Sequence, residues 1–289
     1  MLHGAMTALI TPFANDAVDV AKLKANVEEQ LAVGMDGLVP VGTTGESPTL
    51  SHDEHRRVIE TVVQTVAGRA KVVAGTGSNA TSEAVELTRF AQQVGADAAL
   101  IVNPYYNKPT QEGLYRHFMA IAEAAEIPIV LYNIPGRCGV ALTTDTIVRL
   151  AEHENIVAVK EATGSLDQSS DIVASCDLTV LSGDDSLTLP IMSVGGKGVI
   201  SVISNLLPAR VKALTDAALA GDFEQARTLH LQLFPLCRAM LSMATNPIPI
   251  KTAMKLAGKD TGDLRLPMCP MDETLEAKLE TLLRKHSVI

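Results

Sequence analysis

Six short apolar runs in this sequence are each followed at once by polar residues that could do chemistry. The polar segments are Gly42-Thr-Thr-Gly-Glu46, Gly75-Thr-Gly77, Asn103-Pro-Tyr-Tyr106, Tyr132-Asn-Ile-Pro-Gly-Arg137, Lys160-Glu-Ala-Thr163 and Ser182-Gly-Asp-Asp185. If the apolar runs are parallel strands, these segments gather at the edge where the strands end, which is where α/β proteins build their sites.

Lys160 offers the most specific chemistry. It follows Ile156-Val-Ala-Val159, so we expect its side chain to rise inside an apolar mouth. Only a neutral amine attacks a ketone, and burial favours the neutral form of a lysine. The position therefore suits Schiff-base catalysis. The alternative is a lysine that ends a strand and extends to water.

Four further side chains could take part in such a reaction, and a fifth has a bracing role. Tyr132 could carry protons or could fill an aliphatic barrel. Thr43 and Thr44 lie between two glycines, where they could relay protons and bind a carboxylate, or cap a turn. Arg137 could hold a carboxylate through two hydrogen bonds, or be a solvated loop charge. Glu46 is expected to brace its loop.

Eight apolar runs, each followed by a helix-like stretch, must position these residues. The expected strands are Ala5–Ile10, Gly37–Val41, Lys71–Ala74, Ala98–Val102, Ile129–Tyr132, Ile156–Val159, Leu178–Leu181 and Val199–Val202. Their continuous apolar character indicates strands buried on both faces. Ser51, Thr81 and Thr143 are expected helix N-caps. Eight units in a row predict an α/β fold, a (β/α)8 TIM barrel.

The alternation of expected strands and helices stops after Gly221. Phe223–Ala244, Ile248–Leu256 and Asp272–His286 are expected helices with no strand between them. We therefore expect a (β/α)8 catalytic barrel in residues 1–221 and a C-terminal helical domain in residues 222–289.

Composition excludes several classes of function. The formal net charge of -9, from 24 basic and 33 acidic residues, argues against nucleic-acid and anionic-membrane partners. The four cysteines are scattered, which indicates reduced thiols in a cytoplasmic protein, and the N-terminal residues do not resemble a signal peptide. None of the seven histidines forms an H-x-H or H-E-x-x-H pattern, so we expect no catalytic metal.

Three motifs together resemble a known superfamily. Gly42-Thr-Thr-Gly-Glu46, Tyr132-Asn-Ile-Pro-Gly-Arg137 and Val159-Lys-Glu-Ala162, in this order, are similar to the class I pyruvate-lyase superfamily, which includes the N-acetylneuraminate lyases. The similarity runs from Gly4 through the C-terminal helices. Thr44, Arg137 and Asn103-Pro-Tyr-Tyr-Asn-Lys-Pro109 resemble the dihydrodipicolinate synthase family in particular.

The resemblance implies condensation of pyruvate with L-aspartate 4-semialdehyde on the diaminopimelate route to lysine, with no cofactor. It implies that Lys160 forms the imine with pyruvate, and that Tyr132, Thr43 and Tyr106 relay protons. The implied substrate-binding residues are Thr44 for the pyruvate carboxylate, Arg137 for the semialdehyde, and Gly183 and Ile200 through main-chain atoms.

The same resemblance implies a homotetramer built from two tight dimers, with Tyr106 supplied by the neighbouring subunit. It also implies inhibition by L-lysine at a site with the residues Ser47, His52, His55, Asn79, Glu83 and Tyr105.

Two alternatives to this function stay open. A sister aldolase acting on a keto-deoxy sugar acid or N-acetylneuraminate would share the imine chemistry, although Arg137 argues against it. A barrel kept only for binding would not need Lys160, Tyr132 and Thr43 together.

Overall fold

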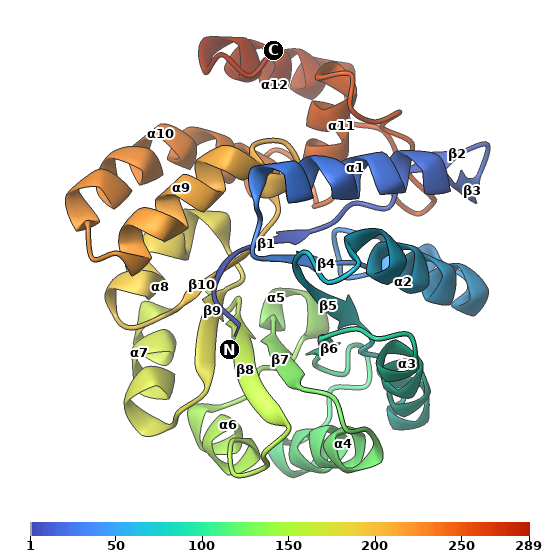
Figure 1. Ribbon diagram of the computed structural model, residues 1–289, viewed down its shortest axis with the longest axis vertical. Coiled ribbons are helices and arrows are strands. Elements are labelled where there is room, and N and C mark those ends of the chain that lie inside the picture. The colour runs from blue at the N-terminus through green and yellow to red at the C-terminus, as the bar shows by residue number, and fades with distance from the viewer. Residues whose placement is uncertain (1) are drawn as a thin grey trace.

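The computed structural model describes residues 2–289 as a closed barrel of eight parallel strands ringed by helices (Figure 1). The barrel order is β1-β10-β9-β8-β7-β6-β5-β4, and β4 closes onto β1. Its strands are β1 (Gly4–Ala8), β4 (Gly37–Val39), β5 (Lys71–Gly75), β6 (Ala98–Val102), β7 (Ile129–Asn133), β8 (Ile156–Glu161), β9 (Thr179–Ser182) and β10 (Gly198–Ser201). The predicted fold class is confirmed.

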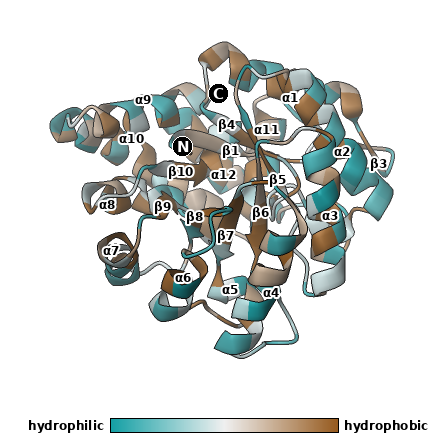
Figure 2. Cartoon of the chain, turned by 60° about the horizontal axis from the view of Figure 1, so that its bottom comes forward, coloured by the Kyte–Doolittle hydropathy of each residue, from teal (hydrophilic) through white to brown (hydrophobic). Residues whose placement is uncertain are grey.

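Each barrel strand is followed by helical structure that covers the outside of the sheet. The helices of this ring are α1 (Val20–Val33), α2 (His52–Val66), α3 (Thr81–Gln93), α4 (Gln111–Ala124), α6 (Thr144–Leu150), α7 (Leu166–Ser175), α8 (Thr188–Ser193) and α9 (Pro208–Leu219). The short helix α5 (Pro135–Cys138), directly after β7, lies inside the ring (Figure 1). The central strands are mostly hydrophobic, whereas the helices turn hydrophilic residues outward (Figure 2). Burial on both faces explains why the strands are nearly continuous apolar runs.

Side chains of alternate residues fill the barrel interior. One buried cluster contains Met6, Val39, Val73, Leu100, Val130, Tyr132, Ala158, Leu181 and Ile200, contributed by all eight strands together with Ala8 and Ala98. Since successive side chains of a strand point to opposite faces, Lys160 shares the inward face of Ala158. The parallel register sets Tyr132 of β7 level with Lys160 of β8, and Lys160 level with Leu181 of β9.

Some local predictions differ from the structure. A small hairpin of β2 (Phe13–Ala14) and β3 (Ala17–Val18) was not predicted, and its turn residues Asn15 and Asp16 both have positive φ. Asn and Asp tolerate that conformation, which two-residue hairpin turns require. Ser51 and Thr143 are N-caps as predicted. Thr81 is not: α3 begins at Thr81 itself after the N-cap Ala80, and the Thr81 hydroxyl bonds His117 instead.

Three helices follow the barrel: α10 (Phe223–Ser242), α11 (Ile248–Leu256) and α12 (Glu273–Lys285), grouped at one side of the ring (Figure 1). Their buried residues belong to one hydrophobic cluster with residues of β1, β10 and α9. The extension therefore shares a hydrophobic core with the seam of the barrel, the place where β1 pairs with β10. The division into a barrel of residues 1–221 and a helical domain of residues 222–289 stays a proposal. Within residues 2–289 no helix combines the length and the apolar composition that crossing a bilayer requires.

Candidate active site

Lys160 is buried at the carboxyl end of the barrel. Its side chain is 5% exposed, and its Nζ lies 4.1 Å from the centroid of the Tyr132 ring. The interpretation of a lysine extending to water is therefore wrong. A buried amine beside a phenol is a suitable arrangement for a nucleophile with a proton carrier at hand.

Gly183 lets the main chain after β9 pass directly against the Lys160 stem. A Cβ at this glycine would lie 2.7 Å from Cβ of Ala162 and 3.2 Å from Cε of Lys160. No larger residue fits there without displacing a neighbour, so the glycine keeps backbone groups close to the amine. Ile200 of β10 is 1% exposed and belongs to the interior cluster.

The loop after β4 carries the two threonines in a tight turn. The Gly45 amide donates to the Gly42 carbonyl at 3.1 Å, which folds the loop back on itself. Thr44 is 3% exposed, and its Oγ1 accepts a hydrogen bond from Nδ2 of Asn246 at 3.1 Å. Thr43 is half-buried. The threonines thus lie on a fixed loop, consistent with holding a small anion.

Asn246 is a site residue that the sequence patterns missed. Besides binding Thr44, it accepts a hydrogen bond from Nη2 of Arg137 at its backbone carbonyl, at 3.0 Å. It therefore links the threonine loop to the short helix α5, on which Arg137 is exposed at the mouth. Asn246 belongs to the helical extension, outside the strand–helix repeat, so no strand end marked it.

Two buried carboxyls hold the backbone near the mouth. Burial raises the pKa of Glu161, although hydrogen bonds from Thr163 and Asn133 oppose that rise. Burial also raises the pKa of Asp185, whose Oδ2 accepts from the amides of Val202 and Ile203, both at 2.9 Å. These carboxyls fix the segments that follow β8 and β10, and neither role was predicted.

Tyr106 does not pack over the barrel of its own chain. Its side chain is 90% exposed, and its φ of 72° is strained for an aromatic residue. Tyr105, the preceding residue, is 36% exposed. The ring of Tyr106 therefore makes little contact with the rest of its own chain.

Three of the residues predicted to bind lysine, His52, His55 and Glu83, lie close together where α2 and α3 begin. Nε2 of His52 lies 2.6 Å from Oε1 of Glu83, and Ser78 donates to the other carboxylate oxygen. His55 bonds the Gly75 carbonyl through Nε2 at 2.8 Å, and burial lowers the pKa of this histidine. Asn79 joins the group through its carbonyl, which accepts from Asn107 of the loop that carries Tyr105. Ser47 opens the 3-10 helix η1 (Ser47–Thr49).

A cavity of about 650 Å³ lies at the opposite end of the barrel from Lys160. It is lined by residues at the starts of strands, among them Lys71, Pro128, Ile156 and Thr179. Chemistry in barrels of this kind is built at the other end, so we locate the candidate active site at Lys160. Among residues 2–289 no cluster of three or more His, Cys, Asp or Glu side chains is arranged to hold a metal ion.

Comparison with known proteins agrees with this geometry. Residues 1–286 match the model of the dihydrodipicolinate synthetase family. A 4-hydroxy-tetrahydrodipicolinate synthase of Geotalea daltonii is 54% identical over the whole of both chains. The crystal structure of dihydrodipicolinate synthase from Aquifex aeolicus is 50% identical, with a TM-score of 0.98 over 99% of each chain.

Two more distant solved structures carry ligands. The enzyme from Acinetobacter baumannii, complexed with pyruvate, is 43% identical with a TM-score of 0.97 over 100% of each chain. The enzyme from Cyanidioschyzon merolae, with lysine bound, is 39% identical with a TM-score of 0.95 over 99% of each chain. From the family match and these similarities, this chain belongs to the dihydrodipicolinate synthetase family.

Proposed function

We propose that this chain condenses pyruvate with L-aspartate 4-semialdehyde through an imine at Lys160. The observation that carries the proposal is the burial of Lys160 in the mouth, beside Tyr132 and against the backbone of Gly183. A member of this family with such a lysine has the nucleophile that the reaction requires.

The reaction begins when Nζ of Lys160 attacks the ketone carbon of pyruvate and water leaves. The methyl carbon of the imine then loses a proton and becomes the enamine carbon. This carbon attacks the aldehyde carbon of the semialdehyde, whose oxygen takes up a proton. Finally the substrate amine attacks the imine carbon, which closes the ring and frees Lys160. The imine nitrogen accepts an electron pair when the methyl carbon loses its proton, and it returns the pair when the enamine carbon attacks the aldehyde, so the mechanism needs no external cofactor.

Each proposed residue has one role in this series of reaction steps. Tyr132, Thr43 and Tyr106 carry protons to and from the reacting oxygen and nitrogen. Thr44 binds the pyruvate carboxylate, and Arg137 binds the carboxylate of the semialdehyde. Gly183 and Ile200 line the pyruvate site with main-chain atoms. Asn246, which bonds both Thr44 and Arg137, supports this arrangement.

Tyr106 acts in trans, across a tight dimer within a homotetramer. Its 90% exposure and strained backbone support this assignment, because a large exposed aromatic is typical of a contact surface. We also propose a cytoplasmic location, on the four scattered cysteines, whose thiols are free.

L-lysine is the proposed effector, bound by the group around His52, His55 and Glu83 with Ser47, Asn79 and Tyr105. The Glu83 carboxylate offers a partner for an ammonium group. We expect partial inhibition at roughly millimolar lysine, as for a small solvated ligand with few polar contacts, without competition with pyruvate. Initial rates at saturating pyruvate measure it, and a rate unchanged by lysine would remove the effector role.

The decisive test of the reaction is chemical trapping. Pyruvate with borohydride should add one reduced adduct per chain, and peptide mapping should place it on Lys160. A coupled assay with pyruvate, L-aspartate 4-semialdehyde and a reductase for the product should then show turnover. An adduct on another lysine, or no adduct, would end the Schiff-base assignment.

A further inference from the structure

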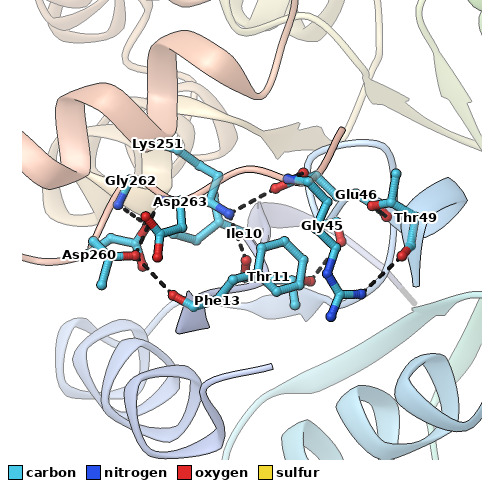
Figure 3. A network of polar contacts seen from close by, with 12 residues as sticks. Ile10, Thr11, Phe13, Gly45, Glu46, Thr49, Lys251, Asp260, Gly262 and Asp263 are labelled. Carbon is cyan, nitrogen blue, oxygen red and sulfur yellow. Dashed lines mark hydrogen bonds and ion pairs between the residues drawn. The ribbon is translucent and has the colours of Figure 1, made fainter. Parts of the chain in front are cut away.

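The loop that carries Thr43 and Thr44 is held in a strained shape by a buried ion pair from the helical extension. Nζ of Lys251, on α11, lies 2.8 Å from Oε1 of Glu46, the last residue of this loop. The two side chains are 0% and 2% exposed, respectively. Figure 3 shows Lys251 extending from its helix to a point between Thr11 and Glu46.

Every remaining polar group of this pair is also engaged with the same region. Lys251 donates a second hydrogen bond to the Thr11 carbonyl at 2.9 Å, and its Nζ lies 4.3 Å from the centroid of the Phe13 ring. The other Glu46 oxygen accepts from the backbone amide of Arg265 at 3.2 Å. A buried pair with all its partners in place fixes geometry more than it adds net stability, because desolvation offsets most of the attraction.

The loop needs such a restraint because its backbone is strained at both ends. Val41 has a φ of 56° and Glu46 a φ of 54°, and the two threonines lie between them. A residue other than glycine in this region costs on the order of 1 kcal/mol or more, and a β-branched residue such as Val41 is especially unfavourable there. The strained conformation persists only if the surroundings impose it.

The contacts that impose it converge on the end of the loop. The Thr11 hydroxyl donates to the Gly45 carbonyl at 2.7 Å, and Lys251 binds both the carbonyl of Thr11 and the side chain of Glu46. The Glu46 amide in turn donates to the Thr43 carbonyl at 3.1 Å. Lys251 is thus connected to Thr43 through Glu46, and through Thr11 to Gly45, the residue that follows Thr44.

We propose that Lys251 is a positioning residue for the pyruvate site, acting through Glu46 to hold Thr43 and Thr44 in place. The inference rests on the proposed function, since it assigns those threonines to pyruvate. It gives the helical extension a specific part in binding the first substrate. Loss of the Lys251–Glu46 pair should therefore weaken pyruvate binding much more than semialdehyde binding.

The test compares Lys251→Met with Lys255→Met as a matched control. Lys255 lies one turn further along α11, is half exposed, and pairs with Glu276 away from the loop. The borohydride-trapped fraction of Lys160, measured against pyruvate concentration, gives the half-saturation for pyruvate. We expect Lys251→Met to raise it about tenfold or more, as for misplaced binding groups. The semialdehyde KM at saturating pyruvate should change by less than about twofold, and Lys255→Met should match the wild type in both.

Two further variants separate positioning from simple stability. Glu46→Leu with Lys251→Met replaces the ion pair by apolar side chains, which commonly preserves or raises stability. This double variant should melt near the wild-type temperature and still bind pyruvate weakly. Glu46→Gln keeps the volume of the side chain, so it should fold even if Lys251→Met does not, and its pyruvate half-saturation should rise as well.

A double-mutant cycle tests the route through Thr44. In a Thr44→Ala background, Lys251→Met should weaken pyruvate binding by less than about twofold further, because the hydroxyl assigned to the pyruvate carboxylate is already gone. Fully additive losses, equal losses for both substrates, or a normal pyruvate half-saturation in folded Lys251→Met would overturn the inference. If the wild type itself forms no adduct at Lys160, the proposed function fails instead, so the two failures are distinct.

Discussion

Adding a single methyl group at Gly183 should slow imine formation at Lys160. Gly183 does not have a positive φ, so alanine meets no backbone penalty there and acts only through its Cβ. That Cβ would lie 2.7 Å from Cβ of Ala162 and 3.2 Å from Cε of Lys160. Non-bonded carbon atoms pack at about 3.5–4.0 Å. Ala162 or the Gly183 backbone must therefore move by about 1 Å, and the Lys160 stem by a few tenths of an ångström.

The displacement sets the size of the effect. Overpacking of this kind costs about 1–3 kcal/mol. If the cost falls on the geometry from which Lys160 attacks, imine formation slows by about five- to 150-fold. The measurement is the rate at which pyruvate and cyanoborohydride add mass to the intact protein.

Gly136→Ala is the control, because no atom lies within 4 Å of its added Cβ at the same mouth. It should trap pyruvate at the wild-type rate. A folded Gly183→Ala protein that also traps at that rate would refute the argument that the backbone must approach the lysine stem at this point.

Three other perturbations test different parts of the site and the fold. Arg137→Ala should lower kcat/KM for the semialdehyde at least about tenfold, through loss of a charge-assisted contact of about 1.5–3 kcal/mol, and should spare imine formation; normal kinetics would make it a loop charge. Mixed dimers of Tyr106→Phe and Lys160→Ala should recover up to about half of the wild-type activity, because one of the two sites regains both the Lys160 amine and the Tyr106 hydroxyl. Activity no higher than the sum of the two parent variants would mean that the Tyr106 hydroxyl acts in cis or is dispensable. Burial lowers the pKa of His117 to about 4, so the folded state resists a proton that the unfolded state takes up below about 6.5. The free energy of unfolding should therefore fall by up to about 3 kcal/mol as the pH drops from 6.5 to 4. Denaturant titrations of His117→Phe should show a smaller dependence of this free energy on pH, whereas His3→Gln, at an exposed position, should match the wild type. An unchanged pH dependence in His117→Phe would exclude His117 as its cause.

The barrel could be predicted because each of its strands has a local signature. Apolar runs of four to six residues alternate with amphipathic stretches, and the residue that ends a run is the one that reaches the mouth. Lys160 and Tyr132 were found in this way, since position along a strand decides which side chains face inward. The hairpin of β2 and β3 was not predicted, because strands of two residues each are too short to show a pattern.

The parts that escaped prediction depend on contacts between distant segments. Asn246 reaches Thr44 across 202 residues, and Lys251 reaches Glu46 across 205. No periodicity or cap marks either residue, because the partner that gives each its role lies on another element. Thr81 failed as a cap for a related reason: His117, on a neighbouring helix, takes its hydroxyl. Tertiary partners of this kind override local preference.

The seam of the barrel has a consequence for the order in which the molecule can form. Gly4 of β1 pairs with Gly198 of β10, and the hydrophobic cluster shared with the extension covers this same seam. A growing chain shorter than about 200 residues has no partner for its first strand on that side, and contacts of such long range form slowly. The segment that braces the threonine loop is synthesised later still. Synthesis from the amino terminus therefore makes the strand of Lys160 well before the helix that braces the threonine loop. If the proposed roles hold, we expect catalytic activity only once the last quarter of the chain is in place.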